Sequence, residues 1–486
     1  MSHSILQRSR CLGAAFALAL MAAAGAAGAD TAAAEPAAPA QSEVRAIFAA
    51  INTAGRQLIW ITDGTRAGTQ PLRLGPNLGV FDNFTDLGDG RVAFSAWQTR
   101  LGLRGAGYVT DGTREGTNLL AAGAWGYVGF NVPTGFTPLR DGRFVFTFPA
   151  LNRERTGHVQ ALWISDGTRA GTGPFYRWPQ QTGTFHATNF ARLRDGEILF
   201  AMDDGRGRQG LELWFTDGTR EGTRLVRNLT GDASGSGPHD LVQLADGLVL
   251  FKAYVGGWQL WVSDGTRAGT LQLTTGGLPG QGLPISEITP IGDGQALFGT
   301  SELWRTDGTV AGTAPMFDAT DARRPIVPHA FTPLGDGRVL FVASVNNYWR
   351  LMVSDGTREG TGIVRQIDWL TTVTMRSLGD GRAVFWHWQP DLGHYALWVT
   401  DGTRQGTGLV QRFPTMVNSV LTHRLQERTT SLGDGRALFA YDNGRTGIEP
   451  WVTDGTRAGT GVLRNINRGG DSNPTGFTPF IPAVTD

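Results

Sequence analysis

The sequence predicts an all-β fold, a single β-propeller built from four-stranded antiparallel blades. Two short motifs alternate along most of the chain, apolar runs rich in β-branched and aromatic residues lie between them, and the two ends of the repeating region carry complementary parts of one repeat unit. Repeat periods of roughly 20 to 50 residues are typical of propellers, solenoids and helical arrays. The short, glycine-punctuated segments exclude the helical arrays.

The first motif is WITDGTRAGT at residues 60–69, and it occurs nine times at a mean spacing of about 49 residues. An Asp-Gly pair between two apolar runs indicates a β-hairpin, because glycine adopts positive φ without a steric cost. Each aspartate is expected to cap the N–H groups of its own turn, which is a structural role and not a calcium site. The nine aspartates are Asp63, Asp111, Asp166, Asp217, Asp264, Asp307, Asp355, Asp401 and Asp454.

The second motif, Gly-Asp-Gly or a close variant, lies between successive copies of the first, as in LGDGRVAF at residues 87–94. Together the motifs delimit four strands in each unit. Strand a precedes Gly-Asp-Gly (331–334), strand b follows it (338–343), strand c carries Leu-Trp (260–263), and strand d follows Gly-Thr (224–227). Four strands in about 49 residues match the size of one propeller blade.

The ends of the repeating region predict a closed ring of nine units. Residues 43–48 match strand b with no strand a before them, and residues 473–480 copy the strand a found at 132–139. Pairing of these two segments closes the ring and leaves no open sheet edge. Because propellers usually have four to eight blades, a ring of seven or eight blades with one degenerate unit is the alternative.

The remaining sequence divides into a leader and a linker. Residues 1–29 have the pattern of a signal peptide, with Arg8 and Arg10 before an apolar run and Ala27-Gly28-Ala29 at its end. Cleavage after Ala29 predicts an exported protein that is periplasmic, extracellular or attached to the cell surface; an uncleaved N-terminal anchor is the alternative. Residues 30–42 are rich in Ala and Pro and predict a flexible linker. The propeller domain is expected to span residues 43–486.

Composition excludes several functional classes. The 43 Lys+Arg balance 43 Asp+Glu, so the net charge of zero argues against a nucleic-acid-binding protein with a broad basic field. Cys11 is the only cysteine and lies in the predicted signal peptide, which excludes disulfides and thiolate metal sites in the domain. We expect no cofactor, no metal, no catalytic residue set, no membrane span after signal cleavage, and a monomer.

One segment, ELWFTDGT at 212–219 followed by Glu-Gly-Thr at 221–223, shows the repeat most clearly. It resembles the bacterial ELWxxDGT repeat proteins, and the resemblance covers residues 48–480. It implies an exported repeat protein, and it implies no established activity. Residues 201–205 look like the acidic b–c loop of that family, and the Asp-Gly-Thr turn is similar to the structural Asp-box of sialidase-type propellers. Glu is absent before Leu-Trp in most units, so the resemblance assigns that Glu no function.

The loops predict where a binding site lies. The a–b and c–d turns are short and uniform, whereas the b–c and d–a connections vary, which places binding on the face with the variable loops. Exposed aromatic rings beside polar groups suit glycan or peptide recognition, although loop tryptophans can also fold inward as plugs. The candidate ligand-binding residues are Trp386, His387, Trp388 and Asp391, expected together in one b–c loop, with Trp97, Tyr254, Asp203 and Asp204.

Two repeated side chains are expected to be structural. The tryptophans of the Leu-Trp pairs recur at one phase of strand c, so inter-blade packing is favoured over sugar stacking. The arginines after Asp-Gly-Thr are expected to pair locally with neighbouring turns and not to form a polyanion site. These residues are Trp60, Trp163, Trp214, Trp261, Trp304, Trp398 and Trp451, and Arg66, Arg114, Arg169, Arg220, Arg267, Arg358, Arg404 and Arg457.

The preferred functional hypothesis is therefore a non-enzymatic, exported propeller that recognises a glycan or protein ligand through the variable b–c/d–a loop face. One alternative is a propeller glycoside hydrolase or lyase with its active site at the central channel. The other is a structural component of the cell surface.

Overall fold

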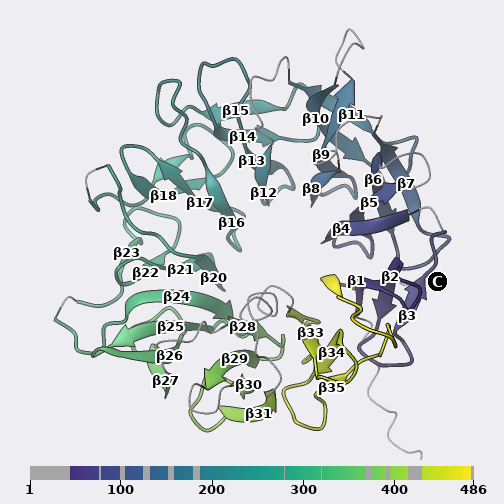
Figure 1. The fold of residues 1–486 in the computed structure, drawn as a ribbon. Helices are drawn as coiled ribbons and strands as arrows, with labels where there is room; N and C mark the ends of the chain where they lie inside the picture. Colours follow the sequence, from purple (N-terminus) through teal and green to yellow (C-terminus); the bar gives the residue numbers. More distant parts are fainter. Residues whose placement is uncertain are drawn as a thin grey trace, which may run out of the picture. The chain divides into compact units, whose positions relative to one another are not determined.

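The computed structural model divides the chain into two compact units, Met1–Gln41 and Ser42–Asp486. All of the described residues lie in the second unit, which forms a ring of strands (Figure 1). Among them, no helix has the length and apolar character that a membrane span requires. The described residues are 44–75, 78–98, 104–123, 132–151, 158–178, 187–278, 280–318, 320–367, 374–389, 394–413 and 429–482.

The ring consists of nine four-stranded antiparallel sheets, which confirms the predicted nine-bladed propeller. Each blade runs from an inner strand a to an outer strand d. From inner to outer strand, blade 1 contains β36 (Thr475–Phe480), β1 (Arg45–Ile51), β2 (Gln57–Thr62) and β3 (Gln70–Leu72); blade 2 contains β4 (Leu78–Asp86), β5 (Val92–Gln98), β6 (Arg104–Thr110) and β7 (Asn118–Ala122); and blade 3 contains β8 (Thr134–Pro138), β9 (Phe144–Leu151), β10 (His158–Ser165) and β11 (Gly173–Arg177). Blade 4 contains β12 (Thr188–Arg192), β13 (Ile198–Met202), β14 (Glu212–Thr216) and β15 (Arg224–Arg227); blade 5 contains β16 (His239–Gln243), β17 (Val249–Tyr254), β18 (Trp258–Ser263) and β19 (Leu271–Gln272); and blade 6 contains β20 (Ile288–Gly292), β21 (Gln295–Gly299), β22 (Leu303–Thr306) and β23 (Ala314–Pro315). Blade 7 contains β24 (Ile326–Pro333), β25 (Val339–Val345), β26 (Tyr348–Ser354) and β27 (Gly362–Gln366); blade 8 contains β28 (Thr374–Ser377), β29 (Ala383–Gln389), β30 (His394–Thr400) and β31 (Gly408–Phe413); and blade 9 contains β32 (Thr430–Ser431), β33 (Ala437–Asp442), β34 (Ile448–Thr453) and β35 (Gly461–Val462).

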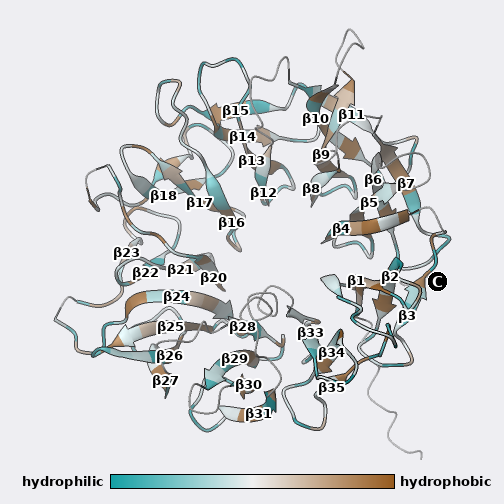
Figure 2. Cartoon of the chain, viewed as in Figure 1, coloured by the Kyte–Doolittle hydropathy of each residue, from teal (hydrophilic) through white to brown (hydrophobic). Residues whose placement is uncertain are grey.

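The core lies between the blades and is built on one repeated cross-strand pair. A fully buried phenylalanine in each strand b faces the Leu-Trp position of strand c, as Phe251 faces Trp261. Trp261 also packs in one cluster with Leu199 and Leu213 of blade 4, so the repeated tryptophans belong to the inter-blade core. Strand b is apolar at most positions because a neighbouring blade covers each of its faces (Figure 2). The phenylalanines are Phe48, Phe94, Phe146, Phe200, Phe251, Phe298, Phe341, Phe385 and Phe439.

Each c–d turn is a small hydrogen-bonded unit, as blade 8 shows. Asp401 Oδ1 accepts the backbone N–H of Thr403 at 2.8 Å and its hydroxyl at 2.7 Å. The hydroxyl of Thr400 accepts the N–H of Gly402 at 3.0 Å and lies 2.7 Å from the hydroxyl of Thr407. The Asp-to-Thr backbone bond is present in all nine turns. The turn aspartates therefore bond to their own loops.

In two of these turns the hydrogen bonds lower the pKa of the aspartate. In blade 6 the hydroxyl of Thr309, and then its backbone N–H, hold the pKa of Asp307 below its usual value of 3.8. In blade 3 the backbone N–H of Thr168 acts in the same way on Asp166. A lowered pKa means that the contribution to stability is present above about pH 3.8 and is lost as the pH falls below it.

The glycine of the Gly-Thr pair leaves room for the carboxylate. A Cβ atom added at Gly406 would overlap the carboxylate of Asp401, and the corresponding overlap occurs in every one of the nine turns. The spacing D-G-T-x-x-G-T therefore follows from packing, because the aspartate side chain fills the volume that a side chain at the second glycine would take.

Arginines of the a–b turns link neighbouring blades on the face that carries the short turns. Arg91 pairs with Asp89 of its own turn and donates through Nη1 to the carbonyl oxygen of Asp166 in the next blade, at 2.9 Å. Arg382 makes the same bond to Asp454 at 3.1 Å. In blades 4, 5 and 6 the equivalent residues are Glu197, Leu248 and Gln295. Other arginines make such bonds at two of these blades: Arg224 to Gly265 and Arg305 to Gly356.

The ring closes through β36, as the sequence predicts. Residue Arg45 pairs with Phe480 and Ile47 with Thr478, so the last strand lies beside β1 as the inner strand of blade 1. The inner strands contact one another in the order β36, β4, β8, β12, β16, β20, β24, β28, β32 and back to β36.

Replacing Gly406 with Ala should lower the free energy of unfolding by about 2–3 kcal/mol, because the new methyl group displaces the Asp401 carboxylate from its turn. Gly408→Ala is the matched control, since a Cβ at this position meets no atom within 4 Å. The control should change the stability by less than about 1 kcal/mol. Chemical denaturation of the two variants measures the difference, and equal effects would contradict the packing role of Gly406.

Replacing Phe480 with Ala should destabilise the protein by about 3–5 kcal/mol, because this side chain is 2% exposed and lies in the core between blades 1 and 2. The neighbouring Ile481 is 58% exposed, and its replacement by Ala should cost less than about 0.5 kcal/mol. Thermal unfolding tests both variants. A Phe480→Ala protein as stable as Ile481→Ala would show that closure through β36 contributes little to stability.

Candidate functional site

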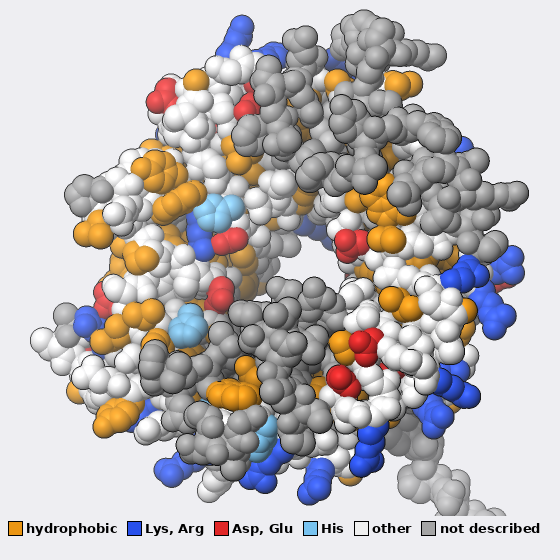
Figure 3. Space-filling view, viewed as in Figure 1, with side chains coloured by type: hydrophobic (Ala, Val, Ile, Leu, Met, Phe, Trp, Pro, Cys, Tyr) orange, Lys and Arg blue, Asp and Glu red, His pale blue; other side chains and the backbone are white. Residues whose placement is uncertain are grey.

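The candidate site is an exposed aromatic group on blade 5, formed by His239, Tyr254 and Trp258. The ring centroids of His239 and Trp258 are 4.6 Å apart at 88°, and those of Tyr254 and Trp258 are 5.4 Å apart at 74°. Edge-to-face packing of this kind fixes the rings while leaving surface open. Trp258 remains 36% exposed. Figure 3 shows a histidine beside basic and acidic side chains over β16–β18 on this face.

A tight b–c hairpin brings the two larger rings together. Tyr254 ends β17 and pairs directly with Trp258 at the start of β18. Gly256 and Gly257 both have positive φ in the turn between them, and a Cβ at Gly257 would approach the backbone N of Gly282 to 2.6 Å. The Tyr254 hydroxyl donates to the carbonyl oxygen of Gly280 at 2.8 Å, which holds its ring beside the neighbouring loop.

An ion pair lies beside the aromatic rings. Lys252 Nζ is 2.7 Å from Asp240 Oδ2, and Lys252 is buried while about half of the Asp240 side chain is exposed. Asp240 has a φ of 52° at a β-bulge, where the register of β16 shifts between His239 and Val242. Bulges re-aim side chains next to functional sites. Here the bulge places a histidine and a carboxylate next to each other at the end of the inner strand.

One backbone contact indicates which nitrogen of the neutral His239 ring carries the proton. His239 Nδ1 lies 3.1 Å from the carbonyl oxygen of Gly237, which can only accept a hydrogen bond. In the neutral ring the proton is therefore on Nδ1, and Nε2 is left as an acceptor. The site thus combines an aromatic surface with an ammonium donor, a carboxylate acceptor and an imidazole acceptor.

Blade 7 repeats the arrangement. His329 packs edge-to-face on Trp349, with ring centroids 5.4 Å apart at 79°, and its Nδ1 lies 3.0 Å from the carbonyl oxygen of Val327. Tyr348 is exposed at the start of β26, and the guanidinium of Arg350 lies 5.2 Å from the centre of its ring.

The predicted loop cluster at Trp386 is wrong in its placement. Trp386, His387 and Trp388 lie on strand β29, and Trp386 is 3% exposed among Phe413, Phe439 and other core residues. Side chains one and three residues after the central phenylalanine share a face of strand b. The first of these lies deep between the blades and the second lies at the rim, so Trp386 is buried and Trp388 is partly exposed. Asp391 lies outside the described residues.

Four predicted residues occupy one structural position. Trp97, Asp203, Tyr254 and Trp388 each lie three residues after the central phenylalanine of strand b, in blades 2, 4, 5 and 8. Trp388 packs on Tyr395 with ring centroids 4.8 Å apart. These side chains come from four separate blades, so they do not form one cluster. His239, Lys252 and Asp240 complete the blade 5 site and are not among the predicted residues, because the β-bulge that shifts the register of β16 has no periodic sequence signature.

The acidic b–c loop of blade 4 is a self-contained turn. Asp203 Oδ1 accepts the N–H of Gly205 at 2.9 Å, and Asp204 Oδ1 accepts the N–H of Arg206 at 2.9 Å. Asp204 is buried. Among the described residues, no group of three or more His, Cys, Asp or Glu side chains is placed to hold a metal ion.

The arginines after Asp-Gly-Thr depart from the expected local pairing. Within the described part of the chain, Arg358 is the only one of the eight in an ion pair, and it binds Asp318 and Asp321. The other seven are exposed at the tips of the c–d turns. Each turn also contains an aspartate, so the charges nearly balance around the ring.

Two buried glutamates shape the d–a loops of the variable face. Glu212 accepts hydrogen bonds from the backbone N–H groups of Leu229 and Ser236 and from the Ser236 hydroxyl, at 2.6 to 3.2 Å. Glu449 bonds in the same way to Ile466 and Ser472. The Glu before Leu-Trp in blade 4 and its equivalent before Pro-Trp in blade 9 therefore organise the following loop, whereas Glu302 at the same position in blade 6 pairs with Arg324.

Burial raises the pKa of the Glu212 carboxyl above its usual value of 4.5, and the hydrogen bonds from Ser236 and Leu229 only partly oppose this effect. Burial raises the pKa of Glu449 for the same reason. A raised pKa means that the folded state binds the proton more tightly than the unfolded chain does.

No protein family model matches the chain, and no curated protein matches it in sequence. Solved structures resemble it in fold. A puromycin-hydrolysing peptidase of Mycobacterium tuberculosis is 14% identical with a TM-score of 0.37, over 75% of this chain and 57% of the peptidase, so the chain spans little more than half of its length. TolB from Acinetobacter baumannii is 11% identical with a TM-score of 0.28, over 67% of this chain and 77% of TolB. The β-propeller domain of the Trilobed protease from Pyrococcus furiosus is 12% identical with a TM-score of 0.32, over 69% of this chain and 98% of that domain.

Glu212→Gln should change the pH dependence of stability. The contribution of Glu212 is complete below about pH 4.5 and is lost as the pH rises through the raised pKa, whereas Gln does not titrate. The melting temperature of the wild type relative to the variant should therefore fall as the pH rises above about 4.5. Glu359→Gln, at an exposed position of a c–d turn, is the control. A wild-type advantage that grows with pH would contradict the raised pKa.

Proposed function

We propose that the protein is an exported binding propeller of the ELWxxDGT repeat type that recognises a glycan through the blade 5 site. The observation that supports this most directly is the exposed face of Trp258, held by His239 and Tyr254 beside the Lys252–Asp240 ion pair. A fixed aromatic surface suits the C–H face of a sugar ring, and the neighbouring hydrogen-bond donors and acceptors suit its hydroxyl groups.

The second His–Trp pair, on blade 7, extends the proposal. His329 and Trp349 occupy strands equivalent to those of His239 and Trp258, and exposed Tyr348 lies next to them. Two sites of the same kind on one protein suit a ligand with repeating units, because linked binding events raise the overall affinity.

Binding is favoured over catalysis by the composition of the site. Glycoside hydrolysis uses two carboxylates on either side of the scissile bond. In the blade 5 site as described, Asp240 is the single carboxylate, and it is paired with Lys252. A protein ligand remains the alternative for the same surface, because aromatic and basic side chains also recognise peptides.

Trp258→Ala should weaken glycan binding at least tenfold, which corresponds to about 1.4 kcal/mol, because it removes the stacking surface. The wild type is first screened on an array of neutral and acidic oligosaccharides, and the strongest binder is then titrated by calorimetry. Leu271→Ala, an exposed apolar residue on β19 of the same blade, is the control and should bind as the wild type does.

Equal affinity of the Trp258→Ala variant and the wild type would contradict the proposed site. A blank array together with peptide capture that depends on Trp258 would replace the glycan with a protein ligand.

A further inference from the structure

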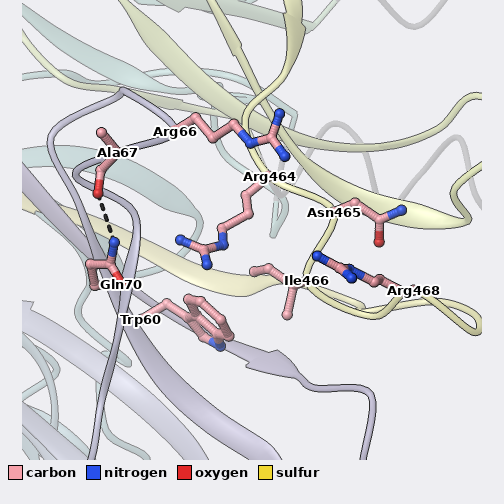
Figure 4. A pocket seen from close by; sticks show the side chains of 8 residues that line it. All are labelled: Trp60, Arg66, Ala67, Gln70, Arg464, Asn465, Ile466 and Arg468. Atoms are coloured by element: carbon pink, nitrogen blue, oxygen red, sulfur yellow. Dashed lines mark hydrogen bonds between the residues drawn. The ribbon is translucent and has the colours of Figure 1, made fainter.

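A cavity lies at the seam where the last blade meets the first. It has a volume of about 560 Å³ and is bounded by the c–d turn of blade 1 and by the segment after β35 of blade 9 (Figure 4). Three arginines line it: Arg66 from blade 1, and Arg464 and Arg468 from blade 9. The cavity lies apart from the blade 5 site in the chain and in the ring, so its role is independent of the function proposed above.

The three guanidinium groups are not directly paired with carboxylates. Among the described residues, none of the three forms an ion pair with an Asp or Glu side chain. Arg464 donates through Nη1 to the carbonyl oxygen of Thr69, and its guanidinium lies 5.7 Å from the centre of the Trp60 ring. These contacts fix Arg464 without neutralising it, and Arg66 and Arg468 are exposed at the cavity edge.

Glu449 is the buried carboxylate near the cavity in blade 9, and its hydrogen bonds are made to the backbone and to Ser472. Glu449 accepts the backbone N–H groups of Ile466 and Asn467 at 2.9 and 3.1 Å, and the hydroxyl of Ser472 at 2.7 Å. It therefore holds the backbone that presents Arg464 and Arg468 and does not pair with them. Asn465 also lines the cavity, and its Oδ1 is buried with no hydrogen-bond partner in the described structure.

We propose that this cavity binds an oxyanion, a phosphate or sulfate group, held by Arg66, Arg464 and Arg468. Guanidinium groups bind such tetrahedral anions through paired N–H donors, and three of them around one cavity favour a group with more than one negative charge.

The position of the cavity gives binding a structural consequence. The anion would contact the first and last blades at once, next to the seam that β36 closes. A ligand that binds only the folded ring stabilises it, and here it would do so at the seam between the two ends of the repeat region.

The test compares inorganic phosphate, inorganic sulfate, and a sulfated oligosaccharide with its desulfated counterpart, by calorimetry and thermal shift at low ionic strength. We expect the sulfated oligosaccharide or the inorganic anions to bind and to raise the melting temperature, and the desulfated sugar to have no effect. Preference for the sulfated oligosaccharide over the free anions identifies a glycan as the source of the group. Equal binding identifies a free anion.

The variant Arg66→Gln with Arg468→Gln should weaken anion binding at least tenfold and abolish the thermal shift. Both side chains are exposed, so the variant should fold and melt as the wild type does without ligand. The matched control is Arg114→Gln with Arg457→Gln, which removes two exposed arginines from the same turn position in blades 2 and 9.

Failure of all three anionic probes to bind the wild type would overturn the proposal, as would equal binding by the cavity variant and the control. Trp258→Ala should leave this binding unchanged, which separates the outcome from that for the blade 5 site.

Discussion

The structure depends on one packing constraint that recurs nine times: an aspartate carboxylate occupies the space above a glycine in its own c–d turn. In blade 8 the carboxylate of Asp401 bonds to Thr403 and fills the volume next to Gly406. This turn fixes the geometry between strands c and d, and strand c carries the tryptophan that packs between blades. Local turn chemistry and inter-blade packing are therefore linked through only a few residues of sequence.

The sequence predicts the architecture well because its repeats carry this local chemistry. The nine Asp-Gly-Thr turns, the four strands per repeat and the copy of strand a at residues 473–480 all lead to the closed ring with β36 beside β1. Strand limits differ by a few residues, as for β24, which begins at Ile326 where the pattern marks strand a only from residue 331. The extension contains a β-bulge, whose irregular register has no periodic signature.

The candidate site is less predictable, since it depends on the exact register of neighbouring strands in one blade, which the repeat pattern does not set. Tyr254 is recognisable as a loop-proximal aromatic residue, but its partners His239 and Asp240 come from a bulged inner strand. Trp386 and Trp388 differ by two residues, yet one is core and the other lies at the rim, because Phe413 and Phe439 cover only the first. Residue type does not distinguish the buried Trp386 from the partly exposed Trp388, whereas their positions along strand b do.

The arginine contacts between blades are unequal, and this has a consequence for folding. Nine similar modules in one chain can pair out of order, which is a characteristic failure of repeat proteins. Here Arg91 joins blades 2 and 3 from the a–b turn, Arg224 joins blades 4 and 5 from strand d, and Arg305 joins blades 6 and 7 from strand c. Each acceptor is a backbone carbonyl of the Asp-Gly-Thr turn that all nine blades share, so these bonds join whichever blades meet, and the choice of the correct neighbour rests on side-chain packing between the blades.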